Sequence, residues 1–296
     1  MKKGFILNLL MLLFPLFVEG KNNVYDTPMA DLHQFFGNAN TTYVVRYKHV
    51  FRDTQVIPSN SVLKFDGGSL TGPIRFNSTM LKGSVNLKGS RISGNISNKE
   101  FDASWFCAMD GIEDDAQNIN EMIAVCGNVY FPKGTYRLIS RYDPSGVLKG
   151  GYRDAVNSHI GINRSNVVLR GDQGAEFLTN KVLGTITIFT TPKYIENSIH
   201  DIEIRNLGFR VANDGVNFHE FFHVIKVIGV RGLKIVNCTF DDYWGDAIYL
   251  AHYGDTPKTG ERSRNQNVEI LYNTITGEPT IITEMASPLL MGRMLL

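Results

Sequence analysis

Four short segments of this sequence resemble one another and recur at nearly constant spacing. They read VVLR from Val167, IEIR from Ile202, LKIV from Leu233 and VEIL from Val268, so successive starts lie 31 to 35 residues apart. A constant period in this range is typical of chains that stack one structural unit on the next. Apolar residues alternate within the units, as at Ile202 and Ile204, which predicts strands with one buried face. The repeat therefore predicts a solenoid of β-strands.

The segments between the repeats also read as strands. They are Thr185–Thr190, His223–Gly229 and Ala247–Leu250, and no amphipathic helix fits between successive strands. Short strands stacked along one axis predict an all-β chain folded as a parallel β-helix, in which each turn pairs with the turns above and below. Asn206 and Asn237 follow two repeats, where they suit tight corners and would stack as an internal amide ladder. The alternative is a β-sandwich, which has alternating strands but no reason to repeat at fixed spacing.

One helix is predicted ahead of the repeats. Asp114 and Asp115 supply a carboxylate cap, apolar residues from Ile119 to Cys126 share one face, and Gly127 ends the helix. We expect this helix to lie across the N-terminal end of the β-helix and to cover its unpaired edge.

The chain is expected to have four parts. Residues 56–105 alternate short apolar pairs with Gly, Ser and Asn, which predicts a smaller β-solenoid before the main domain. Residues after 278 carry no repeat signature, which indicates a truncated or frameshifted tail; a natural apolar cap is the alternative. The expected division is a signal peptide at 1–20, a β-rich solenoid segment at 21–100, the parallel β-helix at 101–278 and an atypical tail at 279–296.

The first twenty residues have the layout of a secretory signal peptide. Lys2 and Lys3 precede an apolar run from Phe5 to Val18, which is shorter than the ~20 residues of a spanning helix. We expect secretion to the periplasm or beyond, with no membrane association after cleavage; an uncleaved anchor is the alternative.

Charge and cysteine content exclude other classes. The formal net charge is +1, and a near-neutral chain without clustered cations argues against a nucleic-acid partner. Three cysteines are too few for a disulfide scaffold. We expect Cys107, Cys126 and Cys238 to be buried as small apolar residues.

Two motifs in order carry a family resemblance. WFCAMDGIEDDAQNINEMIA at 105–124, followed by VYFPKGTY at 129–136, resembles the opening of the pectate-lyase-like (pectin-lyase-fold) superfamily. The resemblance covers about residues 101–277, and residues 56–96 resemble the solenoid extension seen before this domain in secreted proteins of gut-type bacteria. It implies a right-handed parallel β-helix with an N-terminal capping α-helix. It also implies a carbohydrate partner, because members are often polysaccharide lyases, glycoside hydrolases or epimerases, and others are tail spikes or adhesins.

The segment NCTFDDYWGDAIYL at 237–250 carries the predicted site. It resembles the stretch of polygalacturonase-like proteins in which a turn with paired Asp residues leads into a strand. Asp246 matches the second carboxylate, Gly245 stands where the first is often found, and Asp241 or Asp242 would supply the missing acid. Because glycoside hydrolysis needs one protonated and one ionised carboxyl, we predict Asp246 and Asp242 as the acid/base pair, with Asp241 as the further catalytic candidate.

Aromatic residues of the same segment are predicted to bind the sugar. Trp244 and Tyr243 would stack on sugar faces, and His252 follows on the exit loop. The structural alternative is that Asp241 and Asp242 cap a corner while Trp244 packs a loop.

Two other patterns are interpreted as structural. His219 and His223 form a literal HEXXH motif, but the strand that follows would hold them about 13 Å apart at ~3.3 Å per residue, too far to share a zinc ion. The acids at 110–115 lie at a helix N-terminus, where they complement the dipole. No metal and no cofactor are predicted.

The first hypothesis is therefore a secreted glycoside hydrolase that acts on uronic-acid-containing polysaccharides. A polysaccharide lyase of the same fold is the alternative reaction and would use Ca²⁺. The residues available for it are Asp201, Glu203, Asp241, Glu269, Arg205 and Arg231. The alternative from another class is a non-catalytic carbohydrate-binding, adhesin or tail-spike-like protein. The oligomeric state stays open.

Overall fold

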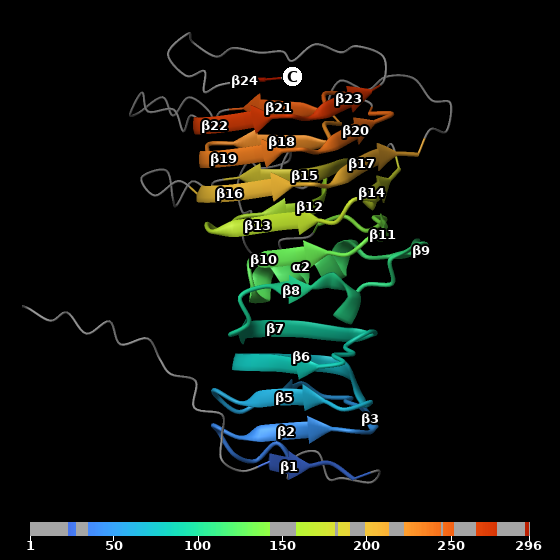
Figure 1. Ribbon diagram of the computed structural model, residues 1–296, viewed down its shortest axis with the longest axis vertical. Coiled ribbons are helices and arrows are strands. Elements are labelled where there is room, and N and C mark those ends of the chain that lie inside the picture. Colours follow the sequence, from blue (N-terminus) through green and yellow to red (C-terminus); the bar gives the residue numbers. More distant parts are fainter. Residues whose placement is uncertain are drawn as a thin grey trace, which may run out of the picture.

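The computed structural model describes residues 23–27, 35–142, 158–180, 183–189, 199–212, 222–243, 245–251, 265–276 and 294–295. Almost all regular structure in these residues is β-strand, and every strand pairing among them is parallel. The strands lie across the long axis of the molecule and stack along it (Figure 1). The predicted all-β class with parallel sheets is confirmed, and the arrangement is compatible with a β-helix.

The N-terminal stack is built around one long strand. Its members are β1 (Asn23–Tyr25), β2 (Thr42–Val45), β3 (Lys48–Val50), β4 (Gln55–Val56), β5 (Val62–Phe65), β6 (Ser69–Gly83) and β7 (Ser90–Ile96). Successive parts of β6 pair with β3, β4 and β5, and β7 pairs with β6 on the side opposite β4. At the first end of the stack, Phe35 and Phe36 pack edge-on against Tyr43.

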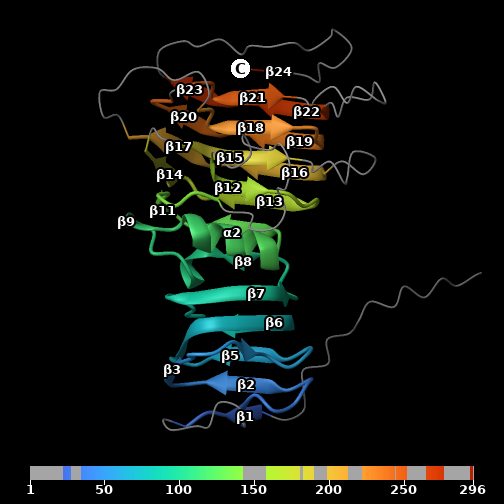
Figure 2. The ribbon, with the colours of Figure 1, turned by 180° about the vertical axis from the view of Figure 1, so that it is seen from behind.

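The C-terminal stack contains three parallel sheets. Sheet I holds β8 (Phe101–Asp102), β10 (Asn128–Phe131), β13 (Val167–Gly171), β16 (His200–Arg205), β19 (Arg231–Val236), β22 (Gln266–Leu271) and β24 (Met294–Leu295). Sheet II holds β9 (Asp110–Asp114), β11 (Gly134–Arg137), β14 (Ala175–Thr179), β17 (Gly208–Val211), β20 (Thr239–Asp241) and β23 (Thr274–Thr276). Sheet III holds β12 (Ser158–Ile162), β15 (Gly184–Phe189), β18 (Ile225–Ile228) and β21 (Ile248–Ala251). From β10 to β23 the chain visits sheets I, II and III in turn (Figure 2).

The four sequence repeats stack in register in sheet I. Val167 lies opposite Ile202, Ile202 opposite Leu233, and Leu233 opposite Val268. The predicted period therefore equals one turn of the stack. Residues 1–20 and most of the predicted tail at 279–296 lie outside the described residues.

The corners after β16 and β19 contain the predicted asparagines. Asn206 and Asn237 have φ of 56° and 54°, and the Asn237 Nδ2 donates to Asn206 Oδ1 at 2.9 Å. The ladder exists, but this bond lies on the exposed surface rather than inside the stack. A buried side-chain bond joins the next two turns: Asn273 Oδ1 accepts from the Cys238 amide at 2.8 Å.

Aromatic side chains form a column inside sheet II. Tyr136, Phe177, Phe209 and Phe240 occupy one register position in successive strands. The ring centroids of Phe177 and Phe209 are 5.5 Å apart, and those of Phe209 and Phe240 are 5.1 Å apart. Each such pair adds about 0.5–1.5 kcal/mol beyond the area that it buries.

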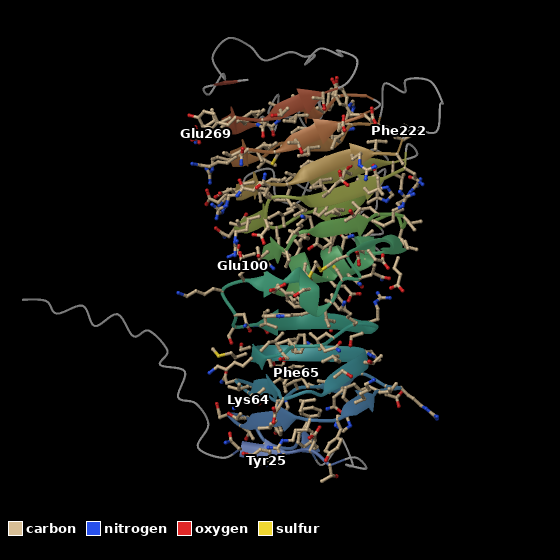
Figure 3. The ribbon with its side chains drawn as sticks, turned by 45° about the vertical axis from the view of Figure 1, so that its right-hand side comes forward. Tyr25, Lys64, Phe65, Glu100, Phe222 and Glu269 are labelled. Carbon is tan, nitrogen blue, oxygen red and sulfur yellow. The ribbon has the colours of Figure 1, made fainter. Side chains whose placement is uncertain are left out.

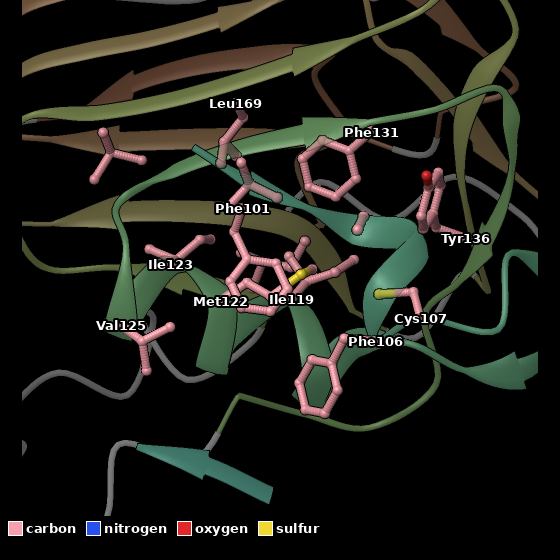
Figure 4. Close-up of a cluster of buried hydrophobic side chains, with 14 of the residues drawn as sticks. Phe101, Phe106, Cys107, Ile119, Met122, Ile123, Val125, Phe131, Tyr136 and Leu169 are labelled. Atoms are coloured by element: carbon pink, nitrogen blue, oxygen red, sulfur yellow. The ribbon is translucent and has the colours of Figure 1, made fainter. Parts of the chain in front are cut away.

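Helix α2 (Ala116–Val125) lies between the two stacks (Figures 1 and 2). Ile119, Met122 and Ile123 are buried as predicted, within the apolar cluster of Figure 4. The helix packs against β12 on one side and β7 on the other. The helix therefore lies beside β12, the first strand of sheet III, and the N-terminal stack continues on its other side.

Two side chains of α2 replace strand pairing at these contacts. Asn120 donates to His159 O and accepts from the Gly161 amide of β12, at 2.9 and 3.0 Å. Glu121 accepts from the Ile92 amide of β7 at 2.7 Å and from Arg91 Nε at 2.5 Å. Unpaired edge amides on both sides are therefore satisfied by polar side chains of the helix.

Candidate functional site

Most long connections of the C-terminal stack flank sheet III. Sheets I and II are joined by tight corners, such as residues 206–207 and 237–238. The connections into and out of sheet III include residues 138–157, 212–224 and 252–265. Because functional residues tend to lie on loops held by a rigid scaffold, the surroundings of sheet III are the first place to look for a site.

Buried polar side chains gather in the same region. The core of sheets I and II is mostly apolar, whereas sheet III and the residues leading into it bury Ser158, His159, Thr185, Thr187, His223 and Asp246. Burying polar groups costs free energy unless they are paired. This concentration therefore requires specific partners, and in a functional site such partners position reactive groups.

Asp246 and His223 are hydrogen-bonded to each other on adjacent turns. Ile225 lies opposite Ile248, which sets His223 level with Asp246, two residues before each strand. Asp246 Oδ2 is 3.0 Å from His223 Nδ1, and only 12% and 6% of the two side chains are exposed. The Asp246 amide is also 3.3 Å from Nδ1. The shorter contact to the carboxylate favours Nδ1–H as the donor to Asp246 Oδ2.

An aromatic ring fixes the plane of the imidazole. His223 stacks on Tyr249 with ring centroids 4.1 Å apart and an interplanar angle of 7°. Lys226 lies opposite Tyr249 in the sheet, with Nζ 5.6 Å from the ring centroid. Beside His223, a cavity of about 10 Å³ is lined by Thr185 and Phe222, among others, a volume close to the minimum for one water molecule.

The structure separates the predicted acids. Asp241 ends β20, is exposed, and accepts from Thr276 Oγ1 at 2.9 Å. Asp242 is exposed in a left-handed corner with φ of 53°. The pKa of Arg210 is raised, first by its hydrogen bonds to Glu176 and further by the charges of Asp241 and Asp242. These two acids therefore act on the outer side of sheet II, whereas the partner of Asp246 is a histidine.

The predicted sugar-binding residues are only partly placed. Tyr243 is half-buried and packs against the core, while Trp244 and His252 lie outside the described residues. Sequence reasoning missed His223 as a site residue, although it belongs to the HEXXH pattern. Residues 219–221 lie outside the described residues, and His223 itself precedes strand β18 rather than lying in a helix.

The acids near α2 have structural roles. Asp114 accepts from the Ala116 amide at 3.1 Å and from the Ile139 amide at 2.9 Å. Asp115 makes no cap; it is fully buried and accepts from the amides of Ala108 and Met109. Burial raises the pKa of Asp115 from 3.8 to about 6. The predicted structural role of this acidic stretch agrees with these contacts, with Asp114 as the only capping carboxylate of the pair.

Asp115 gives the stability a distinct pH dependence. Because its pKa is higher in the folded than in the unfolded chain, the native state binds more protons between pH 3.8 and about 6, so stability falls as pH rises through this window. Ionisation of Asp115 is expected to lower the free energy of unfolding by about 3 kcal/mol by pH 7. Urea unfolding at several pH values measures the free energy of unfolding of the native chain and of Asp115→Asn. The difference between the two free energies is expected to change by this amount across the window. Parallel pH profiles for the two proteins would contradict it.

The calcium ligands considered from the sequence are not gathered into one cluster. Asp201 pairs with His200, Glu203 with Arg205 and Glu269 with Lys234. In the described part of the chain, no group of three or more His, Cys, Asp or Glu side chains is placed to hold a metal ion.

Two further findings complete the description. None of the helices in the described ranges is both long and apolar enough to cross a membrane. No protein-family model, no curated protein and no solved structure matches the chain.

Proposed function

We propose that the chain is a secreted, right-handed parallel β-helix protein of the pectate-lyase-like superfamily that cleaves glycosidic bonds in a polysaccharide. The observation that carries this proposal is the buried Asp246–His223 pair. It lies at the start of sheet III, among the long connections, and includes the carboxylate expected from the sequence.

Hydrolysis is the first reaction that the pair supports. Asp246 holds the His223 ring with its proton on Nδ1, so that Nε2 is the nitrogen that takes up a proton and returns it to the reacting sugar. Stacking on Tyr249 fixes the ring plane, which keeps the reacting nitrogen in one direction.

Elimination is the second reaction, and Lys226 favours it. A lyase removes a proton next to the carboxylate of a uronic acid and needs a base together with a cation that neutralises the carboxylate. His223 is the base in this alternative, and Lys226, held near Tyr249 on the same face, is the cation.

The product distinguishes these reactions. The purified chain is incubated with neutral and acidic polysaccharides, and both reducing ends and the ultraviolet absorbance of unsaturated uronides are followed. Reducing ends alone support hydrolysis, and absorbance with reducing ends supports elimination. If no polysaccharide gives reducing ends or ultraviolet absorbance but one of them retains the chain, the protein is a non-catalytic binding or adhesin-type protein and the proposed enzyme is wrong.

A further inference from the structure

A shallow furrow runs along the stack on the outer face of sheet I. Its volume is about 340 Å³, within the ~300–1,000 Å³ of small-ligand sites. It crosses four adjacent strands, β10, β13, β16 and β19, at the point where they begin. The polar side chains that line it are Asn128, Asn166, Asp201, Glu203 and Lys234. This face is separate from the proposed site: in Figure 3, Glu269 of sheet I and Phe222 lie on opposite sides of the molecule.

The backbone itself forms this furrow. Asn166, Asp201 and Gly232 precede equivalent positions of successive strands and have φ of 59°, 58° and 75°. A Cβ at Gly232 would lie 3.0 Å from Asp201 Oδ1. One wall of the furrow therefore contains one residue with left-handed backbone in each turn. The other wall is formed by the outward-facing side chains of sheet I.

The spacing of these rows selects an extended occupant. Asn128, Val168, Glu203 and Lys234 are in register across the four strands. Neighbouring strands lie ~4.8 Å apart, so hydrogen-bonding groups recur at about that interval along the axis. This interval is comparable with the advance per sugar in an extended glycan. Val168 interrupts the polar row with an apolar surface that suits the C–H face of a pyranose ring.

The charges of the furrow are already compensated. Glu203 pairs with Arg205 at 3.1 Å, Lys234 with Glu269 at 3.2 Å, and Asp201 with His200 at 2.8 Å. A polyanion would meet two carboxylates here and a single lysine, so the furrow favours a neutral occupant rich in hydroxyl groups.

We propose that this furrow binds an extended, neutral glycan chain. The choice of a carbohydrate rests on the proposed function, whereas the position of the furrow does not. The furrow would hold the polymer on a face away from Asp246 and His223 and would raise the local concentration of substrate without taking part in cleavage.

A pair of double variants tests the furrow. Asn166→Gly/Asp201→Gly removes two polar groups at left-handed positions, where glycine introduces no backbone strain. Asn206→Gly/Asn237→Gly is the matched control, because it makes the same kind of change at the other corner of the sheet. The probes are immobilised hexasaccharides, neutral ones of glucose, xylose, mannose, galactose or arabinose and acidic ones of galacturonic or glucuronic acid.

The native chain is expected to be retained by at least one neutral hexasaccharide. The furrow variant should lose about ten-fold in affinity for it, while the control and Asp246→Asn bind as the native chain does. Thermal unfolding checks that each variant folds, and Glu203→Gln replaces the double variant if it does not. The proposal is overturned if no neutral hexasaccharide is retained, if the furrow variant binds equally well, or if Asp246→Asn abolishes binding. Because binding is read without cleavage, a failure of the proposed enzyme leaves this result interpretable.

Discussion

Replacing Asp246 by Asn is expected to lower kcat/KM for polysaccharide cleavage by about 10²–10⁴-fold, the usual contribution of general acid–base catalysis. The amide keeps the shape of the side chain and still accepts from His223 Nδ1, so the fold is retained. It removes the negative charge that stabilises a protonated imidazole 3.0 Å away. Steady-state rates for the native and variant chains, with melting temperatures measured in parallel, check this expectation.

The double variant Asp246→Asn/His223→Gln tests whether the two residues act as one unit. Residues that act together are strongly non-additive, so the double variant should be about as slow as the slower single variant. Asp241→Asn is the matched control, since Asp241 is exposed and bonded to Thr276 instead. If the two single-variant losses in kcat/KM multiply in the double variant, or if Asp241→Asn loses as much as Asp246→Asn, then Asp246 and His223 do not form the catalytic unit.

Replacing Phe209 by Ala is expected to lower the free energy of unfolding of the C-terminal stack by about 3–5 kcal/mol. The side chain is 1% exposed, and its ring contacts Phe177 in the turn below and Phe240 in the turn above. The cavity left behind would remove contacts in both directions, and the closely packed column limits how far its walls collapse. Chemical denaturation followed by far-ultraviolet circular dichroism measures the change.

Val56→Ala provides the comparison for Phe209→Ala. Val56 is 46% exposed in the N-terminal stack, so its truncation should change the free energy of unfolding by less than about 0.5 kcal/mol. A change below about 1 kcal/mol at Phe209 would mean that the aromatic column contributes little to the stability of the stack.

The repeat carried most of the fold information because stacking forces like residues into register. Val167, Ile202, Leu233 and Val268 face the same interior at equal intervals, so selection for packing leaves a visible period. The division into sheets was harder to predict. The corner at Asn206 is only two residues long, and the sequence alternates through it as though β16 and β17 were one strand.

The site was less predictable than the fold. Asp246 could be proposed from its local segment, but its partner lies a full turn earlier. Only the pairing of β18 with β21 brings His223 level with it. Asp242 adjoins the segment in sequence, yet its corner directs it to the outer side of sheet II. Proximity in sequence was a poor guide here, because neighbours along a turn face different sheets while partners stack across turns.

The position of α2 has a consequence for how the molecule comes apart. No strand pairing joins the two stacks within the described ranges, and Asn120 and Glu121 alone among the helix side chains bridge to the edge amides of β12 and β7. In linear arrays, cooperativity passes from neighbour to neighbour and is weakest where the interface is poorest. The apolar core continues past the helix and a backbone hydrogen bond joins Leu87 to Trp105, so the two stacks stay coupled, but we expect fraying that starts at either end of the molecule to slow where strand pairing is interrupted.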